Sequence, residues 1–300
     1  MVKKGLVIKS VGSFYTLLLE DKTVLQATLK GKFRISNIKS TNPVVVGDNV
    51  DVEINENEPI GVINNIYHRK NYIIRKSTNL SHQTQIIASN IDQVVLTVTV
   101  SYPRTSTGFM DRFIATAEAY KIPVLIVFNK SDIEESNALL EKYISTYTSV
   151  GYECIKTSVT DNIGIDLLKS KLTDKINLFS GHSGVGKSSL VNRIAPNFNL
   201  KIGEISDVHL KGKHTTTFAE IFEIYENTHI IDTPGIKEFG MVDIEKNELK
   251  FYFKEFKIYG ENCKFANCLH INEPNCSVKQ AVIDGKIPLT RYENYKNMLK

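Results

Sequence analysis

The octapeptide Gly-His-Ser-Gly-Val-Gly-Lys-Ser, at residues 181–188, constrains the fold of this 300-residue chain more than any other feature. Its spacing is that of a phosphate-binding loop, in which glycines let successive backbone N–H groups face phosphate oxygens at the start of a helix. The preceding segment 175–180 can form the strand that leads into such a loop, and segment 188–195 can form the helix after it. The sequence therefore predicts an α/β nucleotide-binding domain.

Each position of this loop has a predicted role in holding a nucleotide. Lys187 would place a positive charge at the outer phosphates, and the Ser188 hydroxyl would bind magnesium. A chance match is the other interpretation, which the strand-loop-helix context disfavours. The predicted contacts are Gly181, His182, Ser183, Gly184, Val185, Gly186, Lys187, Ser188 and Ser189.

The tetrapeptide Asn-Lys-Ser-Asp, Asn129 to Asp132, indicates which base is bound, because it directly follows the apolar strand predicted at 122–128. Asp132 can accept hydrogen bonds from the ring N–H and the exocyclic amine of guanine, whereas adenine would leave this carboxylate unpaired. Asn129 and Ser131 would add polar contacts, and the Lys130 stem would lie across the base. A helix N-cap at Ser131 or Asp132 is the alternative interpretation.

Further loops complete the predicted site. Ser158, within segment 156–164, offers a second loop over the guanine. Asp232, in Asp-Thr-Pro-Gly 232–235, would reach magnesium through water, and the Gly235 N–H would face the terminal phosphate. One of two threonines upstream would close the magnesium shell: Thr216 or Thr217.

One residue expected in many GTPases is replaced. A glutamine that orients the attacking water often follows the Asp-Thr-x-Gly glycine, but this chain has Ile236 there. An isoleucine cannot orient water, so intrinsic hydrolysis should be slow. His214 is the internal candidate for the missing group. It could equally be an exposed loop histidine or an RNA contact.

The order of these motifs along the chain is unusual. In ordinary small GTPases the phosphate-binding loop comes first and the guanine loops come last. Here the guanine loops at 129 and 158 precede the phosphate loop at 181, and the switch segments at 215 and 232 follow it. The pattern predicts a circular permutation, in which the same sheet is cut at a different loop.

The N-terminal segment reads as a small β-barrel. Six short apolar segments between residues 5 and 67 have strand character, including 32–36, and suggest a barrel of the oligonucleotide-binding (OB) type. The stretch between Asp21 and Asp48 has no acidic residue. Its basic residues could contact a phosphate backbone or could simply protect an edge strand. The candidate RNA contacts are Lys30, Lys32, Arg34 and Lys39.

Charge and hydropathy limit the partners and the cellular location that we expect for this chain. Lysine and arginine outnumber acidic residues by ten to seven in 1–70 and by ten to eight in 241–300, but not in between, so the two ends are candidates for contact with polyanions. No apolar run is long enough for a signal peptide core or a membrane span. We expect a cytoplasmic protein without membrane attachment, and a monomer by default.

Three of the four cysteines lie within 263–276, which in a reducing compartment indicates metal rather than disulfides. Three thiolates and one imidazole make a closed tetrahedral zinc set that leaves no position for a reactive water. Unligated buried thiols are the alternative interpretation. The predicted ligands are Cys263, Cys268, His270 and Cys276.

Taken together, these motifs predict three domains: an OB-type β-barrel at 1–68, a circularly permuted α/β P-loop GTPase domain at 69–240, and a mainly helical zinc-binding domain at 241–300. The chain closely resembles the RsgA family over nearly its whole length. The resemblance implies an assembly factor that binds the nearly mature small ribosomal subunit and hydrolyses GTP to GDP on it. It also implies contacts of the OB and zinc domains with ribosomal RNA.

Two other functions are weighed against this one. An RNA-binding scaffold that holds GTP as a structural ligand remains open because of Ile236. A P-loop kinase of a small substrate is disfavoured, since the Asn-Lys-Ser-Asp and Asp-Thr-Pro-Gly motifs would have no role in it.

Overall fold

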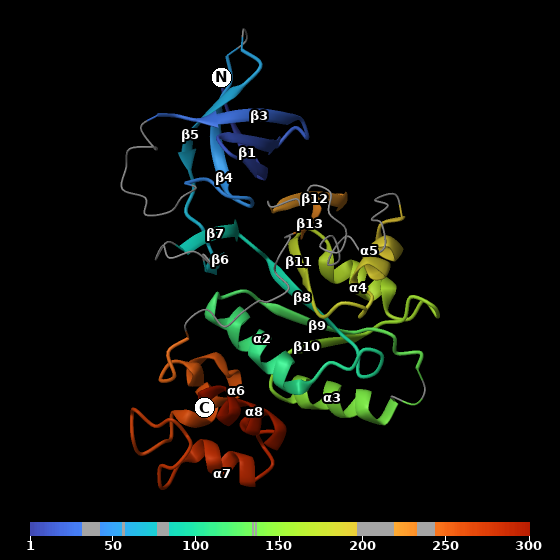
Figure 1. Cartoon of the computed structure of the whole chain (residues 1–300), viewed down its shortest axis with the longest axis vertical. Coiled ribbons are helices and arrows are strands. Elements are labelled where there is room, and N and C mark those ends of the chain that lie inside the picture. Colours follow the sequence, from blue (N-terminus) through green and yellow to red (C-terminus); the bar gives the residue numbers. More distant parts are fainter. Residues whose placement is uncertain are drawn as a thin grey trace. The chain divides into compact units, whose positions relative to one another are not determined.

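The computed structural model describes residues 1–31, 43–55, 58–76, 84–133, 135, 137–196, 219–232 and 244–300 (Figure 1). The chain forms two compact units. The first comprises 1–93, 170–179 and 195–236, and the second comprises 94–169, 180–194 and 237–300.

The first unit begins with a closed five-stranded barrel. Its strands follow the order β1-β2-β3-β5-β4, and β4 pairs back onto β1. All neighbours are antiparallel except β3 and β5. This confirms the OB-type barrel, although the sixth predicted segment, 32–36, lies outside the described residues. The strands are β1 (Val2–Val11), β2 (Phe14–Leu19), β3 (Val24–Leu29), β4 (Asn49–Glu53) and β5 (Gly61–Ile66).

Alternation of apolar and polar residues along these strands explains the barrel. In β2, every second side chain is buried, and Leu17 is fully enclosed. Val7, Val50, Val52 and Ile63 are likewise inaccessible and meet in the barrel interior. Because the side-chain period of a strand is two, this pattern also fixes the strand register.

The end of the barrel is joined to the following segment by a buried carboxylate. Asp48 accepts hydrogen bonds from Arg69 at 2.6 and 2.7 Å, from the Ser89 hydroxyl at 2.7 Å and from the Val45 N–H at 2.9 Å. Gly47 lies beside it at φ +91°, and an added Cβ would meet the Ser89 carbonyl oxygen at 2.0 Å. The segment after the barrel is therefore fixed to it by hydrogen bonds rather than by a loose linker.

Two further groups of strands belong to the first unit. A hairpin of β6 (Tyr72–Lys76) and β7 (Thr84–Ser89), which the sequence analysis did not predict, forms its own small sheet. β12 (Glu220–Tyr225) pairs with β13 (Thr228–Asp232), which runs parallel to β11 (Ile176–Ser180). The barrel strand β1 pairs with β12 at Lys9 and Glu220, whose side chains form an ion pair at 2.9 Å.

The second unit contains three parallel strands in the order β10-β9-β8 with helices after them (Figure 1). Every residue of β8 and β9 is buried, as expected for parallel strands covered on both faces. The elements are β8 (Gln93–Val98), α2 (Thr107–Ala119), β9 (Val124–Phe128), α3 (Asn137–Ser149), β10 (Glu153–Lys156), α4 (Ile165–Leu172) and α5 (Lys187–Ile194).

The C-terminal part of this unit is mainly helical, as predicted. Phe253 and Phe256 pack edge-on against Tyr295, with ring centroids 5.3 and 4.7 Å from it. Ala115 of α2 belongs to the same apolar cluster, so this core is continuous with the helix before it. The elements are η3 (Leu249–Tyr252), α6 (Lys254–Gly260), α7 (Ser277–Ile283) and α8 (Leu289–Leu299). Over the described residues, no helix has the length and apolarity to cross a membrane.

A buried ion network joins α8 to α2. Arg291 donates to both carboxylate oxygens of Glu255, at 2.7 and 3.0 Å, and to Asp111 Oδ1 at 2.7 Å. The second oxygen of Asp111 accepts from Asn294 at 2.6 Å, and the Tyr147 hydroxyl also donates to Asp111. All three charged side chains are nearly inaccessible. Such a network is costly to break because its remaining charges would stay buried without a partner.

We therefore expect Arg291→Ala to lower the free energy of unfolding by about 3–5 kcal/mol, since two carboxylates lose their shared cation. Urea denaturation followed by circular dichroism measures this change. Lys286→Ala, which removes an exposed pair with Asp284, is the matched control and should leave the transition midpoint unchanged. Equal midpoints for the two variants would contradict the structural role assigned to Arg291.

Candidate functional site

The phosphate-binding loop lies between β11 and α5, where the sequence predicts it. Two of its glycines are required by the surrounding backbone. Gly181 has φ +142°, and an added Cβ would meet the Thr97 carbonyl oxygen at 2.1 Å. Gly186 has φ +93°, and its Cβ would lie 2.4 Å from Asn129 Nδ2. The loop is therefore packed against the ends of β8 and β9.

Lys187 and Ser188 begin α5 and are both buried. The Lys187 ammonium donates to the carbonyl oxygens of Gly181 and His182, both at 2.8 Å. These bonds hold the charge over the loop, beside backbone N–H groups at a helix N-terminus. That arrangement attracts phosphate oxygens.

Asn129 connects the guanine loop to the phosphate loop. Its Nδ2 donates to the Val185 carbonyl oxygen at 2.8 Å, and its Oδ1 accepts from the Thr157 hydroxyl at 3.0 Å. Its backbone N–H donates to the Val98 carbonyl oxygen at 2.8 Å. One buried amide thus fixes three loops that follow β9, β10 and β11.

The other residues of the Asn-Lys-Ser-Asp motif are half-buried and lie at the carboxyl end of β9. The Ser131 N–H donates to the Thr157 carbonyl oxygen at 3.1 Å. Lys130 has φ +60° and its ammonium donates to the Tyr102 carbonyl oxygen at 2.7 Å. The half-buried Asp132 carboxylate is within reach of a ligand from solvent.

The second guanine loop is a tight turn. Ser158 and Ile163 exchange two backbone hydrogen bonds of 3.0 Å, and the Ser158 hydroxyl accepts from the Asp161 N–H at 3.0 Å. The Ser158 side chain is therefore used within its own loop, and the loop backbone is the part that could face a base.

One neighbour of the phosphate loop was not predicted from the sequence. The His182 ring packs against Phe109 of α2, with ring centroids 3.9 Å apart. Partial burial, helped by the nearby Lys187 charge, lowers the pKa of His182. No sequence motif predicts the contact between His182 and Phe109, because the two residues are far apart in the chain and belong to different elements.

Of the remaining predicted site residues, the structure describes two. Asp232 is the last residue of β13 and is half-buried. Lys30 follows β3 and is exposed. The remaining ones lie outside the described residues: Lys32, Arg34, Lys39, His214, Thr216, Thr217, Gly235 and Ile236.

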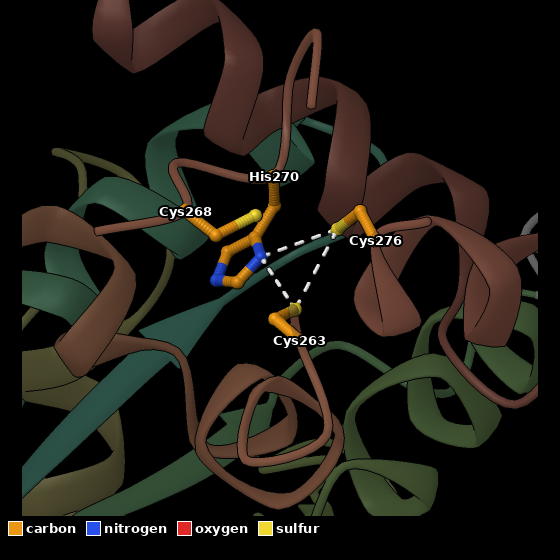
Figure 2. A group of neighbouring side chains, drawn as sticks. All are labelled: Cys263, Cys268, His270 and Cys276. Carbon is orange, nitrogen blue, oxygen red and sulfur yellow. Dashed lines mark hydrogen bonds between the residues drawn. The ribbon is translucent and has the colours of Figure 1, made fainter. Parts of the chain in front are cut away.

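The four predicted metal ligands converge in the C-terminal domain (Figure 2). His270 Nδ1 lies 3.3 Å from Cys276 Sγ and 3.6 Å from Cys263 Sγ, and the two sulfurs are 3.8 Å apart. All four ligand atoms, including Cys268 Sγ, lie within 4.8 Å of one another. A tetrahedral zinc ion with bonds of about 2.0–2.3 Å needs ligand separations of roughly 3.5–3.8 Å. The donor set therefore fits a metal ion of this kind.

The surrounding groups shape the ligand loop. Burial lowers the pKa of His270 to about 4, which keeps its imidazole neutral and able to ligate. The Glu273 carboxylate accepts from the N–H groups of Leu269 and Ile271 at 2.7 and 2.9 Å. Tyr292 and Tyr295 of α8 donate to the His270 and Leu269 carbonyl oxygens at 2.7 and 2.8 Å.

Comparison with known proteins agrees with this geometry. A family model described as the RsgA GTPase matches residues 66–242, and one described as the RsgA N-terminal domain matches 4–63. The chain is 51% identical to the small ribosomal subunit biogenesis GTPase RsgA of Phocaeicola vulgatus, over 99% of this chain and 96% of that protein. The protein of the same name from Flavobacterium johnsoniae is 49% identical, over 99% of this chain and 92% of that protein.

Two solved structures share the fold over the whole chain. YjeQ from Thermotoga maritima has a TM-score of 0.83 and 36% identity, covering 100% of this chain and 98% of that one. YloQ, described as a circularly permuted GTPase, has a TM-score of 0.77 and 29% identity, covering 100% of this chain and 94% of that one. The likeness to this structure confirms the predicted circular permutation.

The Asn129 contact leads to a prediction about two glycines of one loop. Gly186→Ala should weaken GDP binding, because its Cβ must displace the amide that joins the loops. Gly184 also has a positive φ, but a Cβ added there would meet only Pro103, at 3.5 Å, which is an ordinary contact. Calorimetric titration with GDP should therefore show at least a tenfold weaker affinity for Gly186→Ala than for Gly184→Ala, about 1.4 kcal/mol. Equal losses would mean that backbone strain alone is responsible.

Proposed function

Because the chain belongs to the RsgA GTPase family, we propose that it binds the small ribosomal subunit late in maturation and hydrolyses GTP there, stimulated by the subunit. That it is a GTP hydrolase follows from the family. The ribosomal partner is supported by the name of relatives that match nearly the whole chain. The observation that carries the proposal is the Asn129 amide, which joins the guanine loops and the phosphate loop into one site.

In this site we assign each loop to one part of GTP. Asp132 recognises the guanine, while Asn129, Lys130, Ser131 and the loop at Ser158 support the base. The loop 181–189 holds the phosphates, with Lys187 as its charge.

Magnesium would be held by Ser188, Asp232 and one of Thr216 and Thr217, and it would neutralise charge on the outer phosphates. The donors are hydroxyl and carboxylate oxygens, which magnesium prefers. Gly235 would offer its N–H to the terminal phosphate.

Hydrolysis by this chain alone should be slow, because Ile236 replaces a residue that commonly orients water. We propose that His214 supplies the missing polar group once the subunit has bound. An imidazole titrates near neutral pH and can accept or donate a proton at the attacking water.

The other two domains would provide the contact with the ribosome. We propose that the barrel, residues 1–68, contacts ribosomal RNA through Lys30, Lys32, Arg34 and Lys39. The permuted GTPase domain would span 69–240, and the zinc domain 241–300. A cytoplasmic monomer is the form that such a ribosome assembly factor would take.

We propose zinc as the metal of the Cys263, Cys268, His270 and Cys276 site. Three thiolates and one imidazole are ligands that zinc prefers, and four protein ligands close the coordination sphere. Its role would be structural, because a domain of this size has a small core of its own.

The test of the function is GTP turnover, measured by phosphate release with the purified chain alone and with isolated small ribosomal subunits. We expect at least tenfold stimulation by small subunits, none by large subunits, and no ATP turnover. His214→Ala should lower only the stimulated rate, by about 10²-fold, as expected for loss of one general acid-base group.

The outcome separates the two functions that were weighed. GTP binding without any stimulation would favour the RNA-binding scaffold, with the nucleotide as a structural ligand. An unchanged stimulated rate in His214→Ala would contradict the catalytic role proposed for His214 but not the proposed function.

The zinc assignment has its own test. Metal analysis of the purified chain should find one zinc per protein, and Cys276→Ser should lose it. Removal of zinc by a chelator should lower the unfolding temperature, since metal binding contributes directly to folding. Cys154→Ser is the matched control, because this cysteine lies outside the cluster. Full metal content in Cys276→Ser would contradict the assignment.

A further inference from the structure

The segment between β8 and α2 carries no nucleotide motif, yet it contacts both nucleotide loops. The Tyr102 carbonyl oxygen accepts a hydrogen bond from the Lys130 ammonium of the guanine loop at 2.7 Å. The Phe109 ring lies against the His182 ring of the phosphate loop, with ring centroids 3.9 Å apart and ring planes inclined by 35°. We name residues 99–109 the support segment.

The support segment is fixed by its own hydrogen bonds. The Thr105 N–H donates to the Thr99 carbonyl oxygen at 2.9 Å, and the Thr105 hydroxyl accepts from the Thr99 N–H at 3.3 Å. At the start of α2, the Ser106 hydroxyl accepts from the Phe109 N–H at 3.2 Å, which caps the helix. These bonds place Phe109 independently of any nucleotide.

The stacked pair lies outside the core of its unit. Phe109 is half-buried and His182 is exposed, whereas Met110 of the same helix is fully buried. Helix α2 is anchored instead by Asp111, which belongs to the buried ion network of Arg291. We therefore expect the fold to persist when the Phe109 ring is removed.

The stack reaches the phosphate-binding charge through one residue. The His182 ring packs on Phe109, and the carbonyl oxygen of the same histidine accepts a hydrogen bond from the Lys187 ammonium at 2.8 Å. Side-chain rotamers and backbone angles depend on each other, so holding the ring limits the directions in which this carbonyl can point. Lys187 is the charge expected at the outer phosphates. The position of Phe109 therefore affects where that charge is held.

We propose that Phe109 is a positioning residue for the phosphates of the bound nucleotide. By stacking on His182, its ring keeps a carbonyl oxygen of the phosphate loop in the direction that holds the Lys187 ammonium over the loop. The proposal rests on the proposed function only for the identity of the ligand, a guanine nucleotide. It adds to that function a residue that belongs to none of the nucleotide motifs.

The test compares two ligands that share the guanine base and differ in their phosphates. The affinities of the full-length chain for GDP and for guanosine are measured by displacement of a fluorescent GDP analogue. Phe109→Ala should weaken GDP binding about fivefold, the size expected for the loss of one aromatic pair, and should leave guanosine binding unchanged. Guanosine has no phosphate for Lys187 to meet. Phe109→Tyr keeps the ring and should bind both ligands as the unchanged chain does.

A double-mutant cycle tests whether Phe109 acts through His182. His182→Ala should weaken GDP binding by a similar factor. The double variant should bind GDP no more weakly than either single variant, because both changes remove the same contact. Losses that multiply in the double variant would overturn the proposal.

Phe251→Ala is the matched control, because it removes another phenylalanine ring, 52% exposed, that lies outside both nucleotide loops. Its affinities for GDP and guanosine should equal those of the unchanged chain. The unfolding temperatures of Phe109→Ala and Phe251→Ala should also agree, since neither ring belongs to the core. If Phe109→Ala weakens guanosine binding as much as GDP binding, its ring supports the whole site and the positioning role is wrong.

Subunit-stimulated GTP turnover separates this proposal from the function on which it rests. A chain that no subunit stimulates, but in which Phe109→Ala weakens GDP binding alone, would support the positioning role and contradict the proposed function. Normal stimulation together with equal losses for GDP and guanosine would overturn the positioning role and leave the proposed function intact.

Discussion

The Asn129 side chain is the contact on which the nucleotide site depends. Its amide donates to the phosphate loop at Val185 and accepts from Thr157 of the second guanine loop, so three strand ends share one buried group. A buried amide that loses a partner leaves polar atoms unsatisfied, which costs about 1–3 kcal/mol each. The loops are therefore held together as a set, and Gly186 is required because any Cβ there would occupy the place of this amide.

Helix α2 links that site to the C-terminal domain within the second unit. Near the N-terminal end of α2, Phe109 packs on His182 of the phosphate loop. Two residues further on, Asp111 accepts a hydrogen bond from the Arg291 guanidinium. A displacement of α8 relative to α2 would have to break a buried ion pair or move α2 with it. Within the second unit, α2 therefore contacts both the phosphate loop and the C-terminal helices.

Local patterns in the sequence predict several of the elements, but they do not predict the contacts between elements that lie far apart in the chain. The apolar run at 122–128 predicts β9, because a buried strand shows its character within a few consecutive residues. The Cys, Cys, His, Cys spacing likewise predicts the metal cluster. Arg291 and Asp111 are 180 positions apart and belong to no recognisable motif. Their ion pair can therefore be seen only in the folded structure. The pairing of β6 with β7 was not predicted, because two short strands carry too few residues for a clear alternating pattern.

The four clustered side chains Cys263, Cys268, His270 and Cys276 lie beside a small apolar core. This core is formed by residues such as Phe253, Phe256 and Tyr295, and two tyrosine hydroxyls of α8 fix the loop that carries the ligands. A metal ion held by these four ligands would contribute folding free energy directly. Because a domain of this size can bury only a limited apolar core, such a contribution would matter more here than in a larger domain.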